Sequence, residues 1–554
     1  MTSAQNYQAV KAGLSALTHY SNLWDIPDPF TAALFSISQN QAMYQAGTTR
    51  FEALVIHSIT PALESTNLDI TSSRVLLILS TTKANVELLE YPDTPLEMLH
   101  PGECAQRIAK FLGMTTEPIV VCNACVSGLS ALILAERLLS QKIYDYAIVC
   151  GADVLSRFVI SGFQSFKSMD SQPCRPYDIE RLGMNLGEAA ATLILASEEA
   201  EHQEGWKILQ GAIRNDAHHI STPSNKGEGA CRALTPLLQQ VNKEELALVN
   251  AHGTATMFMD QMEAIALHRT ALEDIPVNSY KGYFGHTLGA AGVLETVLTI
   301  HALDDHTILG TRGFQELGVS VPIQVSAESR TTDKQTFIKL ISGFGGSNAA
   351  LLVSSESQIK GHQVEVCPTR QTHRVVITPD GLMTDGKRQS LTATGKALLT
   401  ALYHTYVKDY PKFYKMDGLG KLGFLASELL MACEADTQPT ESEQRAVILF
   451  NHSSSIATDQ RYQTSIQPED YYPSPSLFVY TLPNIVTGEI AIRHHLYGET
   501  SFYILSSRDE QVMMQIQQAA FCDPSTKSMI TVWIDYEDEA HFCADMYILE
   551  TTTP

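Results

Sequence analysis

Short apolar runs alternate with amphipathic stretches along the first 355 residues, and this alternation limits the fold more than any other feature of the chain. Between two of these runs, residues 129–139 place leucines and isoleucine on one side and Glu136 and Arg137 on the other, which is the helical period. Strands that alternate with helices predict an α/β fold with a largely parallel sheet. The expected strands include Val75–Leu79, Ile119–Cys122, Tyr146–Val149 and Thr192–Ala196.

The same pattern restarts near the C-terminus, after a polar stretch that predicts a linker over residues 357–373. "RVLLILSTTKANVEL" from Arg74 is similar to "RAVILFNHSSSIATD" from Arg445: each is an apolar strand, a Ser/Thr-rich turn and a helix start. We therefore expect one domain over residues 1–356 and a reduced copy of its first half over residues 374–554.

Composition excludes several classes of protein. The 554 residues carry a net charge of -23, which disfavours broad nucleic-acid binding. The close pair Cys122 and Cys125 has no second pair or histidine-rich partner segment, so no metal site and reduced cysteines are expected. No run of about 18 apolar residues and no signal-peptide layout occur, so we expect a soluble, cytoplasmic protein without a membrane span.

A cysteine stands where an expected strand turns into an expected helix, in "PIVVCNACVSGLSALILAERLL". Cys125 there would lie at a helix N-terminus, whose dipole and N–H groups favour thiolate over thiol. Small neighbours keep the turn narrow enough for a thioester to approach. A buried structural cysteine is the alternative, and this segment alone does not exclude it.

Three further segments carry polar residues at turns. "ALVNAHGTATMFMDQMEA" contains His252, "VNSYKGYFGHTLGAAGVLE" contains Lys281 and His286, and "LISGFGGSNAALLV" ends a strand in a glycine turn around Phe344. A lone histidine is more often a core or surface residue than a catalyst. The four segments together, in this order, are hard to assign to packing.

The four segments resemble the signature blocks of the elongating β-ketoacyl-acyl carrier protein synthases: the cysteine elbow, HGT, K…GH…GAAG and GFGG-[ST]-N. "CRPYDIERLGMNLGEAAATLIL" and "NDAHHISTPS" also resemble that family, so the similarity covers roughly residues 6–355. The resemblance implies a thiolase-like αβαβα sandwich. It also implies an acyltransferase that condenses a cysteine-bound acyl chain with malonyl-carrier protein, with loss of CO2.

The resemblance assigns roles to individual residues. Cys125 is the acyl-accepting nucleophile, His252 and His286 flank the extender thioester, and Lys281 orients the site. The remaining assignments are Phe344 and Gly345 for the oxyanion and gate, Thr254 and Thr256 for the pantetheine arm, Glu295 and Asn348 for support, and Arg175 for carrier docking. Two of these have plain alternatives, since Glu295 could be a solvated helix residue and Arg175 a loop cation.

The chain departs from the family pattern in several places. Asn123 and Val126 flank the nucleophile in place of the usual residues, and Met257 and Met259 follow HGTAT. The family's first strand is absent from the start of the chain. The C-terminal copy has Arg508 opposite Cys125 and none of the histidine blocks, which indicates a non-catalytic half-domain for packing or partner contact.

The resemblance leaves two functions open. One is a 3-oxoacyl-[acyl-carrier-protein] synthase in fatty acid, aryl polyene or polyketide-type biosynthesis; the other is a non-catalytic partner subunit like the chain-length factors. Such partners usually lose the cysteine, so retention of Cys125, His252, Lys281 and His286 favours the enzyme. The expected partners are an acyl carrier protein and a second subunit, in a homodimer or a heterodimer. We expect the substrates to be bound to the phosphopantetheine of the carrier protein, and we expect no free cofactor.

Overall fold

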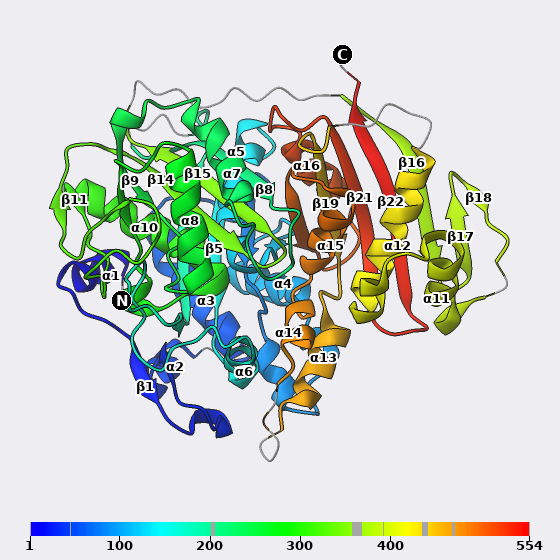
Figure 1. Ribbon diagram of the computed structural model, residues 1–554, viewed down its shortest axis with the longest axis horizontal. Coiled ribbons are helices and arrows are strands. Elements are labelled where there is room, and N and C mark those ends of the chain that lie inside the picture. Colours follow the sequence, from blue (N-terminus) through cyan, green and yellow to red (C-terminus); the bar gives the residue numbers. More distant parts are fainter. Residues whose placement is uncertain are drawn as a thin grey trace.

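Two large mixed β-sheets organise the computed structural model (Figure 1). It describes residues 2–44, 46–200, 205–356, 368–391, 393–434, 441–467, 471 and 473–552. The larger sheet has eleven strands in the spatial order β18 (Lys387–Arg388), β17 (Gly381–Thr384), β16 (Thr369–Thr378), β22 (Phe542–Thr551), β21 (Ser528–Tyr536), β19 (Arg445–Asn451), β20 (Thr500–Ile504), β4 (Ile119–Val121), β3 (Val75–Ser80), β5 (Tyr146–Asp153) and β7 (Ala189–Ala196). The smaller has six, in the order β12 (Gln324–Val325), β10 (Pro276–Asn278), β9 (Leu246–Asn250), β14 (Thr336–Gly343), β15 (Ser347–Ser354) and β8 (Lys207–Asn215).

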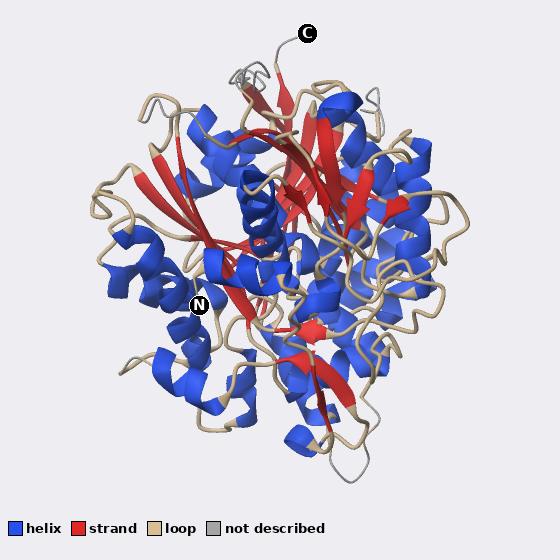
Figure 2. Cartoon of the chain, turned by 90° about the vertical axis from the view of Figure 1, so that its left-hand side faces the viewer, coloured by secondary structure: helices blue, strands red, loops and turns tan. Residues whose placement is uncertain are grey.

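Helices separate the two sheets and cover their outer faces (Figure 2). The helices between the sheets are α5 (Ser127–Ser140) and α10 (Ala291–Asp304). The outer layers contain α3 (Arg50–Glu64) and α4 (Pro101–Leu112) on one side, and α7 (Glu228–Leu238) and α8 (Met257–Arg269) on the other. This αβαβα layering confirms the predicted fold class. In the part of the chain that is described, no helix is both long enough and apolar enough to cross a membrane.

The sequence pattern of the strands follows from this layering. In β3, Val75, Leu77 and Leu79 join the core beneath the outer helices, while Leu76 and Ile78 join the core beneath α5. All five side chains are buried. Strands covered on both faces need apolar residues at every position, which is why they appear in the sequence as continuous apolar runs.

One strand order occurs twice in full and once in part along the chain. If β12 at the edge of the sheet is left aside, residues 207–356 place their first strand beside the fifth, followed by the fourth, second and third: β8, β15, β14, β9, β10. The C-terminal unit repeats this order as β16, β22, β21, β19, β20. The N-terminal half contains the corresponding β7, β5, β3, β4, and β7 is the end strand of the sheet. Apart from its edge strands β17 and β18, the C-terminal unit therefore has the strand order of residues 207–356, and the N-terminal half has four of these five strands.

The two units share one sheet (Figure 1). β20 pairs antiparallel with β4, with Tyr503 opposite Val121 and Ile504 opposite Val120. Helix α16 (Glu510–Ala520) packs against α5 across the same boundary. One apolar core continues from α3 and α4 to α12 (Gly418–Cys433) and α15 (Ile485–His494). Because sheet and core are both continuous, the C-terminal unit is an integral part of the fold.

The linker prediction needs a correction at its C-terminal end. β16 begins at Thr369, so residues 369–373 of the predicted linker are strand, while residues 357–367 lie outside the described part. The first residues of β16 are polar and largely exposed, yet their backbone pairs with β22, where Thr369 faces Thr551. Composition alone therefore suggested a loop where backbone pairing builds a strand.

Candidate active site

The turn that carries Cys125 joins β4 to α5. Ala124 adopts the left-handed conformation, with φ of 49°, and Cys125 follows it directly. The Asn123 side chain accepts a hydrogen bond from the Phe502 backbone N–H at 2.7 Å. The Cys122 N–H donates to the Phe502 carbonyl at 3.0 Å. Strand β20 of the C-terminal unit thus holds the turn that carries Cys125.

The Cys125 thiol is buried, with 8% of the residue exposed. Burial raises the pKa of this thiol to about 12, although Lys281 and the backbone N–H groups of Cys125 and Phe344 act to lower it. The expected preference for thiolate is therefore wrong for the resting site, because desolvation outweighs the N–H groups at the helix start.

Two histidines lie close together in this site. His252 follows β9, and His286 follows the short helix α9 (Lys281–Phe284); their ring centroids are 5.0 Å apart. Burial, reinforced by the charge on Lys281, holds the pKa of both imidazoles well below 6.5, so both are neutral. Nδ1 of His252 and both ring nitrogens of His286 are buried and have no hydrogen-bond partner within the described chain. Buried polar atoms are rarely left unpaired, so these nitrogens are available to a substrate.

Two carboxylates at the start of α8 hold the His252 turn, and the sequence analysis did not identify them. Glu263 accepts the N–H of His252 at 2.6 Å, and Asp260 accepts the N–H of Thr254 at 2.9 Å. The hydroxyls of Thr254 and Thr256 lie 3.0 Å apart. In the sequence, Asp260 and Glu263 are three residues apart directly after the HGT turn. This spacing could have indicated that both carboxylates hold that turn.

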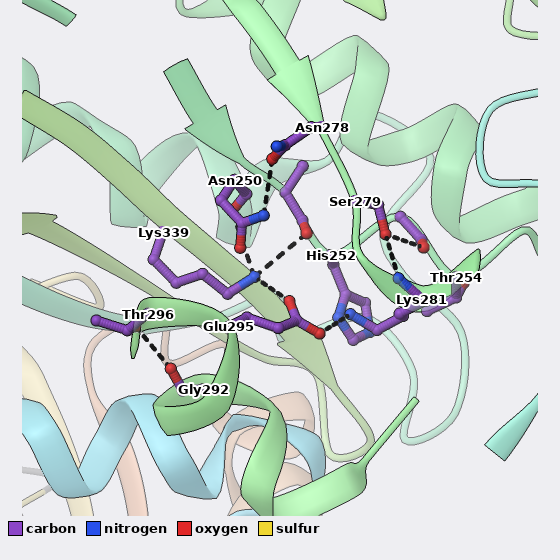
Figure 3. A network of polar contacts seen from close by, with 12 residues as sticks. Asn250, His252, Thr254, Asn278, Ser279, Lys281, Gly292, Glu295, Thr296 and Lys339 are labelled. Atoms are coloured by element: carbon purple, nitrogen blue, oxygen red, sulfur yellow. Dashed lines mark hydrogen bonds and ion pairs between the residues drawn. The ribbon is translucent and has the colours of Figure 1, made fainter. Parts of the chain in front are cut away.

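Two buried lysines share one carboxylate (Figure 3). Lys281 Nζ lies 2.8 Å from Glu295 Oε1, and Lys339 Nζ lies 2.6 Å from Glu295 Oε2. Glu295 is fully buried, so the alternative of a solvated helix residue is wrong. Lys339 also donates to the carbonyls of Asn250 and Ala251, immediately before His252. In the sequence, Lys339 stands in the middle of an apolar strand, which could have indicated a buried ion pair.

The glycine turn between β14 and β15 places Phe344 beside Cys125. Gly345 has φ of +89°, which favours glycine at that position. Asn348 Nδ2 donates to the Gly346 carbonyl at 3.0 Å, which supports the turn from within. From the C-terminal unit, Asn484 Nδ2 donates to the Phe344 carbonyl at 2.9 Å. Residues of both units therefore position the Phe344 backbone.

The buried aspartate Asp153 connects two further segments of the site, and the sequence analysis did not identify it either. Asp153, at the end of β5, accepts hydrogen bonds from the Thr81 hydroxyl at 2.7 Å, the Thr82 N–H at 3.1 Å and the Gly289 N–H at 2.7 Å. Burial raises the pKa of Asp153 to about 6, against the effect of these donors. It ties the turn after β3 to the GAAG segment that follows His286. An acidic residue at the end of a buried strand was its sequence signal.

A small apolar cavity of about 20 Å³ lies beside Cys125. Its walls come from both units: Thr82, Lys83, Ala124, Cys125, Val159, Phe163, Leu288, Phe344, Phe478 and Leu482. Phe478, in α14 (Pro475–Tyr480), and Leu482 belong to the C-terminal unit. That unit therefore forms part of the wall next to Cys125.

Two family models match this chain: the β-ketoacyl synthase N-terminal domain over residues 2–201 and the β-ketoacyl synthase C-terminal domain over residues 207–315. Together they match more than half of the chain. It belongs to the β-ketoacyl synthase family. The family resemblance is thereby confirmed, and the matched residues include the blocks around Cys125, His252 and His286, whereas the glycine turn around Phe344 lies beyond them.

Relatives and solved structures show how much of this chain is shared with known members of the family. The 3-oxoacyl-[acyl-carrier-protein] synthase 2 of Rhizobium meliloti is 32% identical over 42% of this chain and 59% of the relative, so the match spans about six tenths of the relative's length. A β-ketoacyl synthase structure from Burkholderia phymatum covers 63% of this chain and 94% of its own, at 25% identity and a TM-score of 0.58. The structure described as "PfaC Keto synthase-Chain length factor" covers 100% of this chain and 77% of its own, with a TM-score of 0.79. At 12% identity that last likeness shows the fold alone.

The predicted docking cation, Arg175, is engaged within its own chain. Arg175 forms ion pairs with Asp178, at 3.0 Å, and with Glu180, and its Nε donates to the Gly313 carbonyl at 3.1 Å. Its side chain is one quarter exposed. A carrier protein that used Arg175 would have to compete with these two carboxylates.

Proposed function

We propose that this chain is a 3-oxoacyl-[acyl-carrier-protein] synthase that performs a decarboxylative Claisen condensation on carrier-bound thioesters. One observation carries the proposal. A buried thiol that interacts with two backbone N–H groups shares its site with two neutral imidazoles whose buried nitrogens lack partners in the described chain. Acyl transfer needs a nucleophile that is also a leaving group, and sulfur is both.

In the first half-reaction the Cys125 sulfur attacks the carbonyl carbon of an acyl-carrier thioester. The new C–S bond forms, the carrier thiol leaves with the electron pair of the old one, and the proton of Cys125 reaches it through a neutral imidazole. The transient oxyanion lies between the N–H groups of Cys125 and Phe344.

In the second half-reaction a malonyl thioester loses CO2 and becomes an enolate. His252 and His286 donate to the enolate oxygen, which stabilises the charge as it develops. The enolate carbon forms the new C–C bond at the Cys125 thioester carbonyl. Sulfur leaves with the C–S electron pair and is protonated, which releases a 3-oxoacyl thioester and the free thiol.

We propose phosphopantetheine thioesters of an acyl carrier protein as substrates, in fatty acid, aryl polyene or polyketide-type biosynthesis. The hydroxyls of Thr254 and Thr256 suit the amides of the pantetheine arm, and Arg175 is the candidate docking cation. The C-terminal unit acts as a fused, half-sized partner in the manner of a chain-length factor. Its support is the β20–β4 pairing and the contact of Asn484 with Phe344.

Intact-protein mass spectrometry with an acyl-carrier thioester tests the function. We expect one adduct, absent from Cys125→Ala and retained in Cys122→Ala, whose equally buried thiol is the matched control. His252→Ala and His286→Ala should slow CO2 release from malonyl-carrier protein by about 10²- to 10³-fold, and more than they slow acyl loading. An adduct on Cys122, or condensation by Cys125→Ala, would refute the assignment.

A further inference from the structure

A second cavity is lined by residues of both units and shares Lys83 with the cavity at Cys125. It measures about 10 Å³. The first unit contributes Lys83, Val86, Leu89, Leu99 and Pro101 to its lining, and the second contributes Ser453, Ser454, Ile456 and Asp459. Lys83 also lines the cavity beside Cys125. The two cavities thus adjoin at Lys83.

Lys83 is held in that position by the C-terminal unit. Its Nζ lies 2.7 Å from Asp459 Oδ1 and 3.3 Å from the Ser455 hydroxyl, and it also donates to the Thr481 carbonyl. The exposed fractions of the Lys83 and Asp459 side chains are 5% and 8%. Asp459 lies on α13 (Ile456–Ser465), so this buried ion pair spans the boundary between the units.

An ion pair is an unusual way to close an apolar cavity. Taking two charges out of water is costly, and well-packed apolar side chains often stabilise a protein as well or better. Aromatic and aliphatic side chains make most of the other walls, and the Phe158 ring centroid lies 5.7 Å from Lys83 Nζ. An acyl chain that grew past this point would have to separate Lys83 from its acceptors without replacing their hydrogen bonds, which is a severe penalty.

We propose that the Lys83–Asp459 pair determines acyl-chain length by closing the far end of the cavity beside Cys125. The inference rests on the proposed function and names its substrate class as short acyl thioesters. About 20 Å³ holds little more than one small group, since a single water needs about 10–15 Å³. Removal of both side chains joins the two cavities and admits longer chains.

Paired substitutions avoid leaving one buried charge without its partner. Lys83→Ala with Asp459→Ala removes charge and volume, whereas Lys83→Met with Asp459→Leu removes charge and keeps volume. Lys83→Ser with Asp459→Ser is a second enlarging variant, in which hydroxyls can still meet Ser455 and the Thr481 carbonyl. Arg232→Gln with Glu443→Gln is the matched control, because this ion pair also joins the two units, at 2.8 Å, and lines neither cavity.

The measurement is the ratio of eight-carbon to two-carbon acyl adduct on Cys125, from competing acyl-N-acetylcysteamine thioesters. A ratio within one sample is insensitive to the fraction of folded protein. We expect it to rise about tenfold or more in the alanine and serine variants, because single methylenes in apolar pockets change selectivity by that order. The Met/Leu variant and the Arg232/Glu443 control should keep the wild-type ratio.

The outcomes separate the two proposals. If wild type forms a short-chain adduct and both enlarging variants keep its ratio, the chain-length role is overturned while the proposed function stands. If the Met/Leu variant alone raises the ratio, volume is not the determinant and the inference also fails. If wild type forms no adduct on Cys125, the proposed function itself is overturned.

Discussion

Lys339 decides the charge balance around the two histidines. Together with Lys281 it places two cations on the single carboxylate Glu295, and both lysines lower the pKa of His252 and His286 after the larger effect of burial. Burial also lowers the pKa of Lys339, to about 8, in opposition to its carboxylate partner. Lys339 is therefore a positioning residue that acts through the imidazoles.

Lys339→Met should move the acidic limb of the CO2-release profile upward by about half to one pH unit, because one cation near the imidazoles is lost. Lys339→Arg, which keeps the charge, is the control. Unfolding gives a second readout. The pKa of both histidines is depressed in the folded state, so their contribution to stability is full above pH 6.5 and is lost as pH falls, by about 1.4 kcal/mol per pH unit for each. That acid sensitivity should be weaker in Lys339→Met; an unchanged pH profile and unchanged unfolding would contradict the role.

At the scale of elements, the start of α15 supports the gate turn. Asn484 donates to the Phe344 carbonyl, and a Cβ at Gly488 would lie 2.6 Å from the Gly345 carbonyl oxygen. The helix and the turn are therefore in backbone contact. A change in α15 is therefore expected to move the Phe344 N–H, which faces the Cys125 thiol.

Asn484→Ala should slow acylation of Cys125 about tenfold, since loss of one buried hydrogen-bond partner costs about 1–3 kcal/mol. The maximal rate should fall more than the affinity for the thioester, because the turn positions the oxyanion donor. Thr487→Val is the matched control: its hydroxyl bonds only within the helix, to the Asn484 carbonyl, in the contacts described. Equal losses in both variants would show a general helix effect instead.

At the scale of the whole molecule, the C-terminal unit covers surfaces that the first unit cannot leave in water. It pairs with the β4 edge and continues the apolar core. It also neutralises two buried arginines: Arg137 lies 2.7 Å from Glu499, and Arg214 lies 2.6 Å from Asp523. Removing one partner of a buried pair typically costs about 3–5 kcal/mol.

Truncation after Ser355 should therefore give an aggregating, inactive protein, with an open strand edge, an apolar face and two unpaired cations exposed. Coexpression of residues 368–554 with the truncated chain should restore soluble protein that forms the Cys125 adduct. Light scattering and the adduct assay measure both effects. A soluble, fully active 1–355 fragment would show the C-terminal unit to be dispensable.

The sequence by itself determined the fold class, the family and the positions of the chemistry-bearing turns. Periodicity of apolar residues follows from burial on one or both faces of an element, so neighbouring residues in the sequence are enough to recognise it. The motif blocks around Cys125, His252, Lys281, His286 and Phe344 are likewise local. The charged residues that support these turns could not be assigned from the sequence. A single charged residue in an apolar strand, such as Lys339 or Asp153, does not indicate which residue it pairs with.

Tertiary structure alone decided how the two units cooperate. Nothing local to β20 or α15 shows that they hold Asn123 and Phe344, since these contacts join residues far apart in the chain. The protonation state of Cys125 was also decided there: the helix start predicts a thiolate, but burial by surrounding elements raises its pKa to about 12. Desolvation depends on everything packed around a group, and the pairing of Lys83 with Asp459 depends on two units meeting.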